Sequence, residues 1–461
     1  MKVKRTIPQL IAVTKNEFNL DLLKEMLEIA LKLEFMTIPP YLCALWSILD
    51  NTHQAYSTIK DHIAQEEMLH MGLVCNLLVA LGEKPNLVLG HPSYPDSLPG
   101  LTPEVGPIEL QPLSRAALEL FLEIEYPMNG PIDIANDLEK TSRFLKSGTP
   151  ITAGTIGDFY TQIEMVFVDL NNRGILPEFD MEHQLEWFFG NSEQVGELCK
   201  IEDIQGVHKA IELIKRQGEG SSGSPEDTGI DDLAHYYRFL EISKEHNIEP
   251  VPGTPNQFQY DSQLVPFPNV RPMRPITEEP DGDYSNVSDP VAAEKMRFFD
   301  KKYTEMLLQL EAAWSSSTEG ARYLSAAVVT MGDLSTTAIE LMELNIPGSD
   351  QTYGPYFRVQ EGVELPPLDG IDGEFPLVQD PTWEDNIQYF FTDQDKACMM
   401  IAGREPIDLG SYSQVVENAD DILKRVSLPE GDQYLMPPGA RWHQNKIDTF
   451  DNWINNGTPE G

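Results

Sequence analysis

The sequence contains few cysteines and no long hydrophobic run. None of its four cysteines lies in a CxxC motif, and they are widely separated: Cys43, Cys75, Cys199 and Cys398. A disulfide framework or a thiolate metal site is therefore not expected. The most apolar stretch, FMTIPPYLCALWSIL, is too short for a membrane span and contains two prolines. The first residues lack the apolar core of a signal peptide, so these absences predict a soluble, cytoplasmic protein.

Basic residues are also scarce. The chain has 33 Lys and Arg against 74 Asp and Glu, a formal net charge of -41 over 461 residues. Such a charge repels nucleic-acid phosphates and anionic lipids, so neither nucleic acid nor a membrane is an expected partner. A small-molecule substrate is compatible with it, and a homo-oligomer is left open.

Alternating apolar patterns typical of strands are nearly absent, whereas apolar residues recur at helical spacing through most of the chain. The sequence therefore predicts a mainly α protein. One helix is expected over 20–49, kinked or restarted at Pro39-Pro40, and a second over 54–81. Eight prolines between Pro250 and Pro280 indicate an extended connector. The predicted organisation is a helical bundle over 1–250, a Pro-rich connector over 251–290, a helical extension packed on the bundle over 291–362 and a small helical domain over 380–461.

Ionisable residues interrupt the apolar stripes of three predicted helices. In AQEEMLHM, residues 64–71, Glu67 and His70 share a face with Ile63 and Val74. Glu34 continues the apolar stripe of the first helix, and Glu164 that of a later helix, TIGDFYTQIEMVFVDL. A buried carboxylate costs several kcal/mol unless it is protonated, paired or bound to a metal. Three such stripes therefore indicate a shared cationic partner.

A pair of metal ions fits this pattern. Glu-x-x-His alone is weak support, because about one match is expected by chance in a chain of this composition. A Glu on one helix, ExxH on the next and another inward Glu later is the order of ligands in ferritin-like four-helix bundles. The second ExxH of such bundles is missing. Glu219 and His235 are candidates for the missing ligands, whereas His208 and Glu212, beside Lys215, are interpreted as a solvated pair.

Several motifs carry a family resemblance. EFMTIPPYL, HIAQEEMLHMGLVCNLL, TIGDFYTQIE, AIELIKRQGEG and HYYRF resemble, in that order, the ferritin-like domain of the iminophenylpyruvate dimer synthase group. The resemblance implies a helical bundle with a metal-carboxylate site, and the group's better-known members couple two imines of aromatic 2-oxo acids in bisindole pigment pathways. By motif it implies the ligand set Glu34, Glu67, His70, Glu164, Glu219 and His235. Glu219 rests on the resemblance alone, and His235 mostly so.

The last 80 residues resemble the helical fold of small c-type cytochromes, including the MPPG turn and a terminal helix near Trp453. The haem attachment motif CxxCH is missing, because Cys398 stands alone in DKACMM. We therefore predict a helical domain without covalent haem, whose role is structural or in docking, and in which Met436 is a packed turn residue.

The leading functional hypothesis is an oxidative enzyme of specialised metabolism. It would use dioxygen or peroxide at a dinuclear iron or manganese site, two ions per chain, on a small organic substrate such as an aromatic imine or 2-oxo acid. Two alternatives stay open: a manganese-catalase-like peroxide dismutase, and a non-catalytic protein in which the metal only stabilises the bundle.

Overall fold

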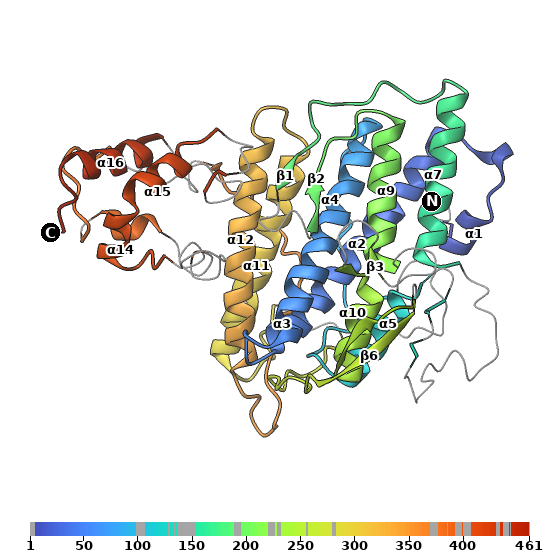
Figure 1. Cartoon of the computed structure of the whole chain (residues 1–461), viewed down its shortest axis with the longest axis horizontal. Helices are drawn as coiled ribbons and strands as arrows, with labels where there is room; N and C mark the ends of the chain where they lie inside the picture. The colour runs from blue at the N-terminus through green and yellow to red at the C-terminus, as the bar shows by residue number, and fades with distance from the viewer. Residues whose placement is uncertain are drawn as a thin grey trace.

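The structure is a computed structural model, and helices dominate the residues it describes (Figure 1). Those residues are 5–97, 107–127, 130–132, 134–135, 154–188, 195–219, 226–227, 232–254, 257–278, 283–368, 377–384, 386–391, 399, 407–429, 434–436, 442 and 444–460. Within them, no helix is both long and apolar enough to cross a membrane. The prediction of a mainly α fold is confirmed.

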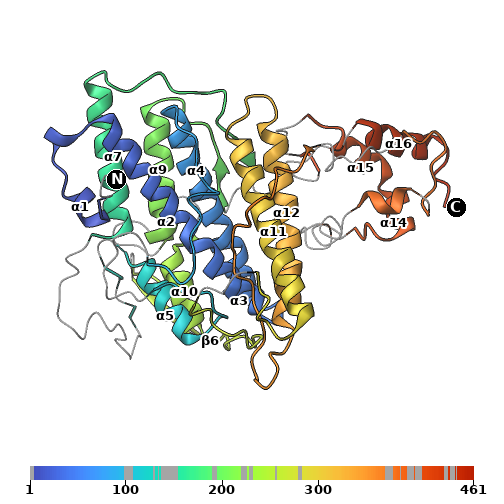
Figure 2. The same cartoon turned by 180° about the vertical axis from the view of Figure 1, so that it is seen from behind.

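Four helices form a closed ring around one hydrophobic core. They are α2 (Leu20–Ser47), α4 (Gln65–Ala80), α9 (Ile204–Glu219) and α7 (Ile156–Asn172), and each contacts the next, with α7 returning to α2. Figures 1 and 2 show the four running side by side. Their apolar side chains belong to a single buried cluster. The ring is the four-helix bundle that the sequence predicts.

Two shorter helices pack at one end of this bundle. α5 (Arg115–Ile124) contacts α10 (His235–Lys244), and α10 also contacts α9. The end of α5 and the beginning of α7 line one pocket, which is described below, and the end of α9 lines it as well. One side of the bundle is thus built from α5 and α7, and another side from α9 and α10. The break between the two helices falls at the same level on both sides. A residue at such a break need not follow the spacing of a helix, so apolar periodicity does not predict the direction of its side chain.

The helix α2 runs straight through Pro39 and Pro40 without restarting. A proline removes the hydrogen bond to the carbonyl four residues earlier, so Pro40 leaves the carbonyl of Met36 without its helical partner. The hydroxyl of Tyr94 donates to that carbonyl at 2.8 Å. This bond from outside the helix satisfies the buried group and lets α2 continue.

The predicted second helix contains a wider turn. α3 (Gln54–Ile59) passes into a π-helical turn, η2 (Lys60–Ala64), and then into α4. A π-turn carries one residue more than an α-turn, so it shifts the angular register of the residues before it relative to those after it. It ends at Ala64, two residues before the first glutamate of AQEEMLHM. Such turns are frequent at functional sites.

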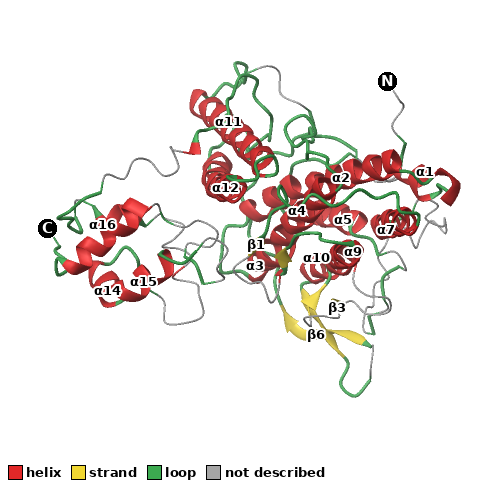
Figure 3. Cartoon of the chain, turned by 90° about the horizontal axis from the view of Figure 1, so that it is seen from above, coloured by secondary structure: helices red, strands yellow, loops and turns green. Residues whose placement is uncertain are grey.

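Beyond the bundle, α11 (Pro290–Ala313) and α12 (Gly320–Met342) form a hairpin that contacts α2 through α12. Figure 3 shows this pair beside the bundle. Part of the segment predicted as an extended connector is instead a strand: β6 (Phe258–Leu264) pairs antiparallel with β5 (His246–Pro250). The short elements are α1 (Ile7–Ile11), η1 (Lys15–Glu17), β1 (Trp187–Phe188), β2 (Glu197–Leu198), β3 (Glu226–Asp227), β4 (Asp232–Leu233) and η4 (Ile387–Phe390).

Asn76 on α4 joins three parts of the core through a fully buried amide. Its Nδ2 donates to the carbonyls of Leu185 and Cys199, and its Oδ1 accepts from the Leu185 amide and from the Trp314 indole, all within 3.0 Å. We expect Asn76→Ala to lower the free energy of unfolding by about 3–5 kcal/mol, because it leaves several buried polar groups unpaired. Chemical denaturation measures the loss. Asn172→Ala, an exposed change at the end of α7, should cost under about 0.5 kcal/mol; equal losses would refute the role of Asn76.

The C-terminal helices form a separate lobe. α14 (Tyr412–Glu417), α15 (Ala419–Val426) and α16 (Gln444–Asn455) lie apart from the bundle in Figures 1 and 3. Their aromatic core, which includes Trp383, Trp442 and Trp453, shares no member with the bundle core among the described residues. Cys398 lies outside the described residues, and Met436 is a turn residue whose amide donates to the carbonyl of Arg425.

Because the two cores are separate, we expect a chain truncated after Leu368 to fold and to retain the metal content of the full chain. Elemental analysis of both proteins measures this. A haem stain of the denatured full chain should be negative, since the sequence has no CxxCH. Loss of metal on truncation, or a positive stain, would contradict the prediction.

Candidate metal centre

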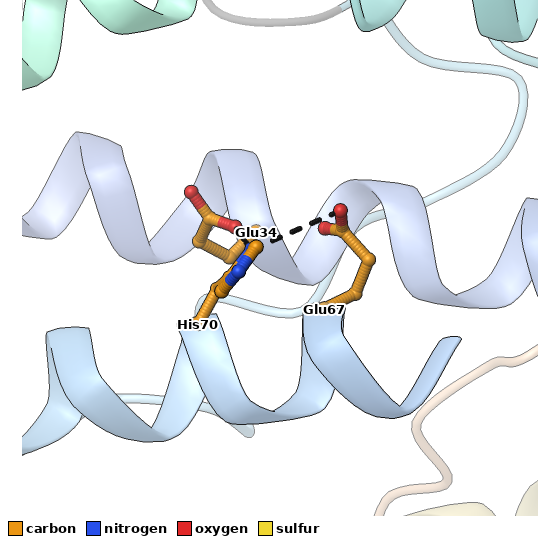
Figure 4. Close-up of side chains that lie close together, drawn as sticks. All are labelled: Glu34, Glu67 and His70. Carbon is orange, nitrogen blue, oxygen red and sulfur yellow. Dashed lines mark ion pairs between the residues drawn. The ribbon is translucent and has the colours of Figure 1, made fainter. Parts of the chain in front are cut away.

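Three of the predicted ligands meet between α2 and α4 (Figure 4). Nδ1 of His70 lies 3.5 Å from Oε2 of Glu34 and 3.9 Å from Oε1 of Glu67. All three residues are at least 95% buried. The helical spacing that placed them inward in the sequence is the reason they meet, because each continues the buried stripe of a long helix.

A second group lies next to the first and shares one member with it. Nδ1 of His235 lies 2.9 Å from Oε1 of Glu67 and 3.8 Å from Oε2 of Glu125. His235 is the first residue of α10, and Glu125 directly follows the last residue of α5. Glu67 therefore stands between two triads, Glu34–Glu67–His70 and Glu67–Glu125–His235. Oε1 of Glu67 faces both His70 and His235, so this one carboxylate oxygen lies between the two groups.

A buried hydroxyl holds one oxygen of each of the three carboxylates. Tyr160 donates to Oε1 of Glu34 at 2.5 Å, Thr37 to Oε2 of Glu67 at 2.6 Å, and Tyr41 to Oε1 of Glu125 at 2.6 Å. In every case it is the other oxygen that faces an imidazole. The hydroxyls thereby fix which oxygen of each carboxylate points into the cluster.

The two imidazoles are oriented in the same way. The side-chain nitrogen of Gln217 donates to the carbonyl of Val195, so its oxygen, 2.9 Å from Nε2 of His70, is an acceptor. Nε2 of His70 therefore donates to Gln217, and Nδ1 is the nitrogen that faces the carboxylates. For His235, Nε2 lies 3.0 Å from the buried carboxylate of Glu66. Metal-binding histidines have this arrangement, with the far nitrogen donating to an amide or carboxylate.

The electrostatics of the cluster favour added positive charge. Burial, and next the charge of Glu125, raise the pKa of Glu67, and burial raises that of Glu66. Burial alone would lower the pKa of His235, but its contacts with three carboxylates, Glu125 first, hold it well above its usual range. The pKa of His70 is also raised, because Glu34 outweighs burial. The cluster therefore attracts protons or metal ions.

The donor set fits iron or manganese. Carboxylate oxygen and imidazole nitrogen are ligands that both metals accept. Nδ1 of His235 is buried and makes no hydrogen bond of good geometry, although Oε1 of Glu67 is 2.9 Å away. Buried polar atoms are rarely left unsatisfied, and a ring nitrogen that faces two carboxylate oxygens is an arrangement that a cation would complete.

The structure places one predicted ligand, Glu164, away from the cluster. Glu164 pairs with the exposed His208, whose Nδ1 lies 2.6 Å from Oε1 of Glu164, and the nearby Glu212 completes a partly exposed group. The sequence prediction that Glu164 faces the interior fails, because the stripe Ile156, Tyr160, Glu164 advances twice by four residues. Each such step drifts about 40° around a helix, which carries Glu164 out of the apolar face. The side chain of Glu219 lies outside the described residues.

Two site residues were missed by the sequence analysis. Glu125 carried a signal, since Leu118, Phe121 and Glu125 are spaced three and four apart in the helix SRAALELFLEIEY. Glu66 carried none, because it is next to Glu67 and lies off the stripe that Ile63, Glu67, His70 and Val74 share. It is buried because α4 is enclosed on all sides, by α2, α9 and β2 among others.

A pocket opens onto the cluster from between the helices. Its lining joins Glu34, Glu67, His70, Glu125 and Tyr160 to aliphatic residues, two glycines and Lys215. The enclosed space is small, about 30 Å³, which suits water, dioxygen or peroxide better than an aromatic ring.

Comparison with known proteins agrees with this fold. Residues 27–244 match the family model described as Ferritin-like. The chain therefore contains a ferritin-like domain, and this domain holds every member of both triads.

The chain is also similar to particular proteins of the predicted group. It is 25% identical over 321 residues to dichlorochromopyrrolate synthase of Lentzea aerocolonigenes, covering 65% of this chain and 29% of that protein. It is 26% identical over 306 residues to 2-imino-3-(indol-3-yl)propanoate dimerase of Chromobacterium violaceum, covering 64% and 26%. The chain thus spans less than a third of the length of these relatives. A solved ferritin-like protein of Caulobacter vibrioides is 22% identical, with a TM-score of 0.49 and coverage of 74% of this chain and 99% of that one.

Proposed function

We propose that the bundle binds two iron or manganese ions and that the protein is an oxidative enzyme acting on a small organic substrate. Glu34, Glu67 and His70 would hold one ion, and Glu67, Glu125 and His235 the other. The observation that carries the proposal is that Glu67 belongs to both triads. Within each triad, every residue offers one oxygen or nitrogen atom that lies close to those of the other two. Glu219 stays a predicted further ligand, whereas Glu164 leaves the proposed set.

Two adjacent ions of iron or manganese supply redox equivalents between an organic substrate and dioxygen or peroxide. The protein's own contribution is to keep the ions together and away from bulk water. The hydroxyls of Tyr160, Thr37 and Tyr41 hold the three carboxylates against their mutual repulsion. Gln217 and Glu66 fix the two imidazoles, which keeps the donor atoms in place in the absence and presence of substrate.

The similar proteins suggest the substrate class. One is named for making dichlorochromopyrrolate and the other for dimerising 2-imino-3-(indol-3-yl)propanoate. An aromatic imino acid, or the 2-oxo acid from which it forms, is therefore the proposed substrate, in specialised metabolism. Coupling two imino acids is an oxidation, and dioxygen or peroxide would take up the electrons. An aromatic body needs more room than the pocket encloses, so it would lie at the mouth or require the lining to move.

The small pocket favours one second candidate, a manganese-catalase-like peroxide dismutase, because peroxide fits a space of about 30 Å³ without movement. The two functions differ in whether peroxide is consumed without an organic substrate. A dismutase releases dioxygen from peroxide alone, whereas the proposed enzyme consumes its oxidant only with an organic substrate.

The test begins with elemental analysis of the full chain purified without added metal. Dioxygen and peroxide are then followed with and without indole-3-pyruvate and ammonium, which form the imino acid in solution, and mass spectrometry detects coupled product. We expect about two ions per chain and a substrate-dependent loss of oxidant. Well under one ion, with no uptake on reconstitution, would refute the metal centre, and rapid evolution of dioxygen without substrate would favour the dismutase.

A further inference from the structure

The pocket beside the metal centre has a cation in its lining. Lys215 lies on α9, one turn before the end of the helix, and among the described residues of this lining it is the only lysine or arginine. Its side chain is 19% exposed, so most of the side chain is buried against neighbouring residues. Nζ donates to Oε1 of Glu212 at 2.9 Å, and Glu212 itself is more exposed.

A lysine at this place opposes metal binding. Like charges repel strongly where water is partly excluded, and the neighbouring carboxylates and imidazoles form a site that attracts cations. If the pocket only held metal, an apolar or acidic residue would serve better there. A lysine becomes favourable when an anion occupies the pocket mouth, because a partly desolvated ammonium group binds a carboxylate through charge-assisted hydrogen bonds.

The rest of the mouth suits an apolar body. Leu33, Ile124, Ile156 and Ile214 supply aliphatic surface, and Gly157 and Gly218 add no side chains. A Cβ on Gly218 would come within 3.7 Å of Oε2 of Glu125, so the backbone of α9 passes close to the second triad at this point. A ligand with an apolar body and an anionic end would therefore find an aliphatic surface for its body and the cation Lys215 for its charged end.

We propose that Lys215 is the subsite for the carboxylate of the substrate, and that it turns an organic acid with an apolar body so that the carbon next to the carboxylate faces the metal centre. The inference rests on the proposed function and adds the charge that the substrate must carry. Lys215 has three donors, and the bond to Glu212 uses one of them. The remaining two are available to a carboxylate, and Glu212 weakens the subsite by competing for the same ammonium group.

The experiment compares two probes of one shape and different charge. Phenylacetate and phenylacetamide are titrated calorimetrically into the metal-loaded full chain. The variants are Lys215→Met, Lys215→Arg, Glu212→Gln and, as matched control on the same helix, the exposed Lys209→Met. We expect the wild type to prefer the anion by about tenfold or more. Lys215→Met should abolish that preference, Lys215→Arg should keep most of it, Lys209→Met should leave it unchanged, and Glu212→Gln should strengthen binding of the anion.

Two results would overturn the subsite: no preference for phenylacetate in the wild type, including no binding of either probe, or a preference that Lys215→Met retains. The latter would mean that the metal ions bind the carboxylate directly. Metal content is measured on the same samples. A wild type without metal counts against the proposed function, whereas a normal metal content with a preference independent of Lys215 counts against the subsite alone.

Discussion

The variant Glu67→Ala is expected to lose both metal ions, whereas Glu34→Ala should lose only one. Glu67 belongs to both triads, and Glu34 to one. Elemental analysis after purification and reconstitution should give about two ions per chain for the wild type, about one for Glu34→Ala and well under one for Glu67→Ala. Activity should fall to background in Glu67→Ala, since neither ion of the redox pair remains.

The stability of the metal-free protein distinguishes this loss of metal from misfolding of the variant. In metal-free protein, removing one carboxylate from a buried acidic cluster relieves repulsion and offsets part of the cost of losing the side chain, so apo Glu67→Ala should stay folded when it is followed by circular dichroism. Glu164→Ala is the matched control, because Glu164 is partly exposed and lies outside both triads. Equal metal loss in Glu34→Ala and Glu67→Ala would argue against a shared ligand, and loss in Glu164→Ala would argue against the site.

The second large effect is expected at His235. His235→Ala should weaken metal binding by about 10–100-fold or more, because it removes an imidazole whose Nδ1 faces Glu67 and Glu125. His208→Ala should leave the metal content unchanged, since His208 is 54% exposed and paired with Glu164. Metal titration of the two variants measures the difference.

The opposite outcome would also be informative. Full occupancy in His235→Ala together with loss in His208→Ala would move the metal to the surface group Glu164–His208–Glu212. Loss in both variants would indicate that metal binding depends on packing of the bundle as a whole rather than on these ligands.

The sequence predicted the half of the site that lies on long helices. Glu34, Glu67 and His70 continue buried stripes in α2 and α4, so their direction follows from helical geometry. Glu125 and His235 lie where α5 ends and α10 begins. Periodicity gives no direction at such points, and there the resemblance supplied His235 while Glu125 was overlooked. The burial of Glu66 depends on neighbours that enclose α4, and a stripe along one helix contains no information about them.

The same limit applies to the fold. The helices were readable from apolar spacing, but contacts between distant segments were not. The continuity of α2 through Pro40 was not readable, because it depends on the hydroxyl of Tyr94, more than fifty residues away in sequence. The strand β6 was hidden in the proline-rich segment, because its pairing with β5 is a contact between two short segments with little alternation.

The separate aromatic core of the C-terminal lobe has a thermodynamic consequence. Two cores that share no side chains can melt independently, so the full chain should show two heat-absorption peaks in calorimetry and has no single melting temperature. A bound ligand raises the melting temperature only of the unit that binds it. Adding metal should therefore shift one peak upward and leave the other in place, which would assign each peak to its part of the chain without cutting the protein.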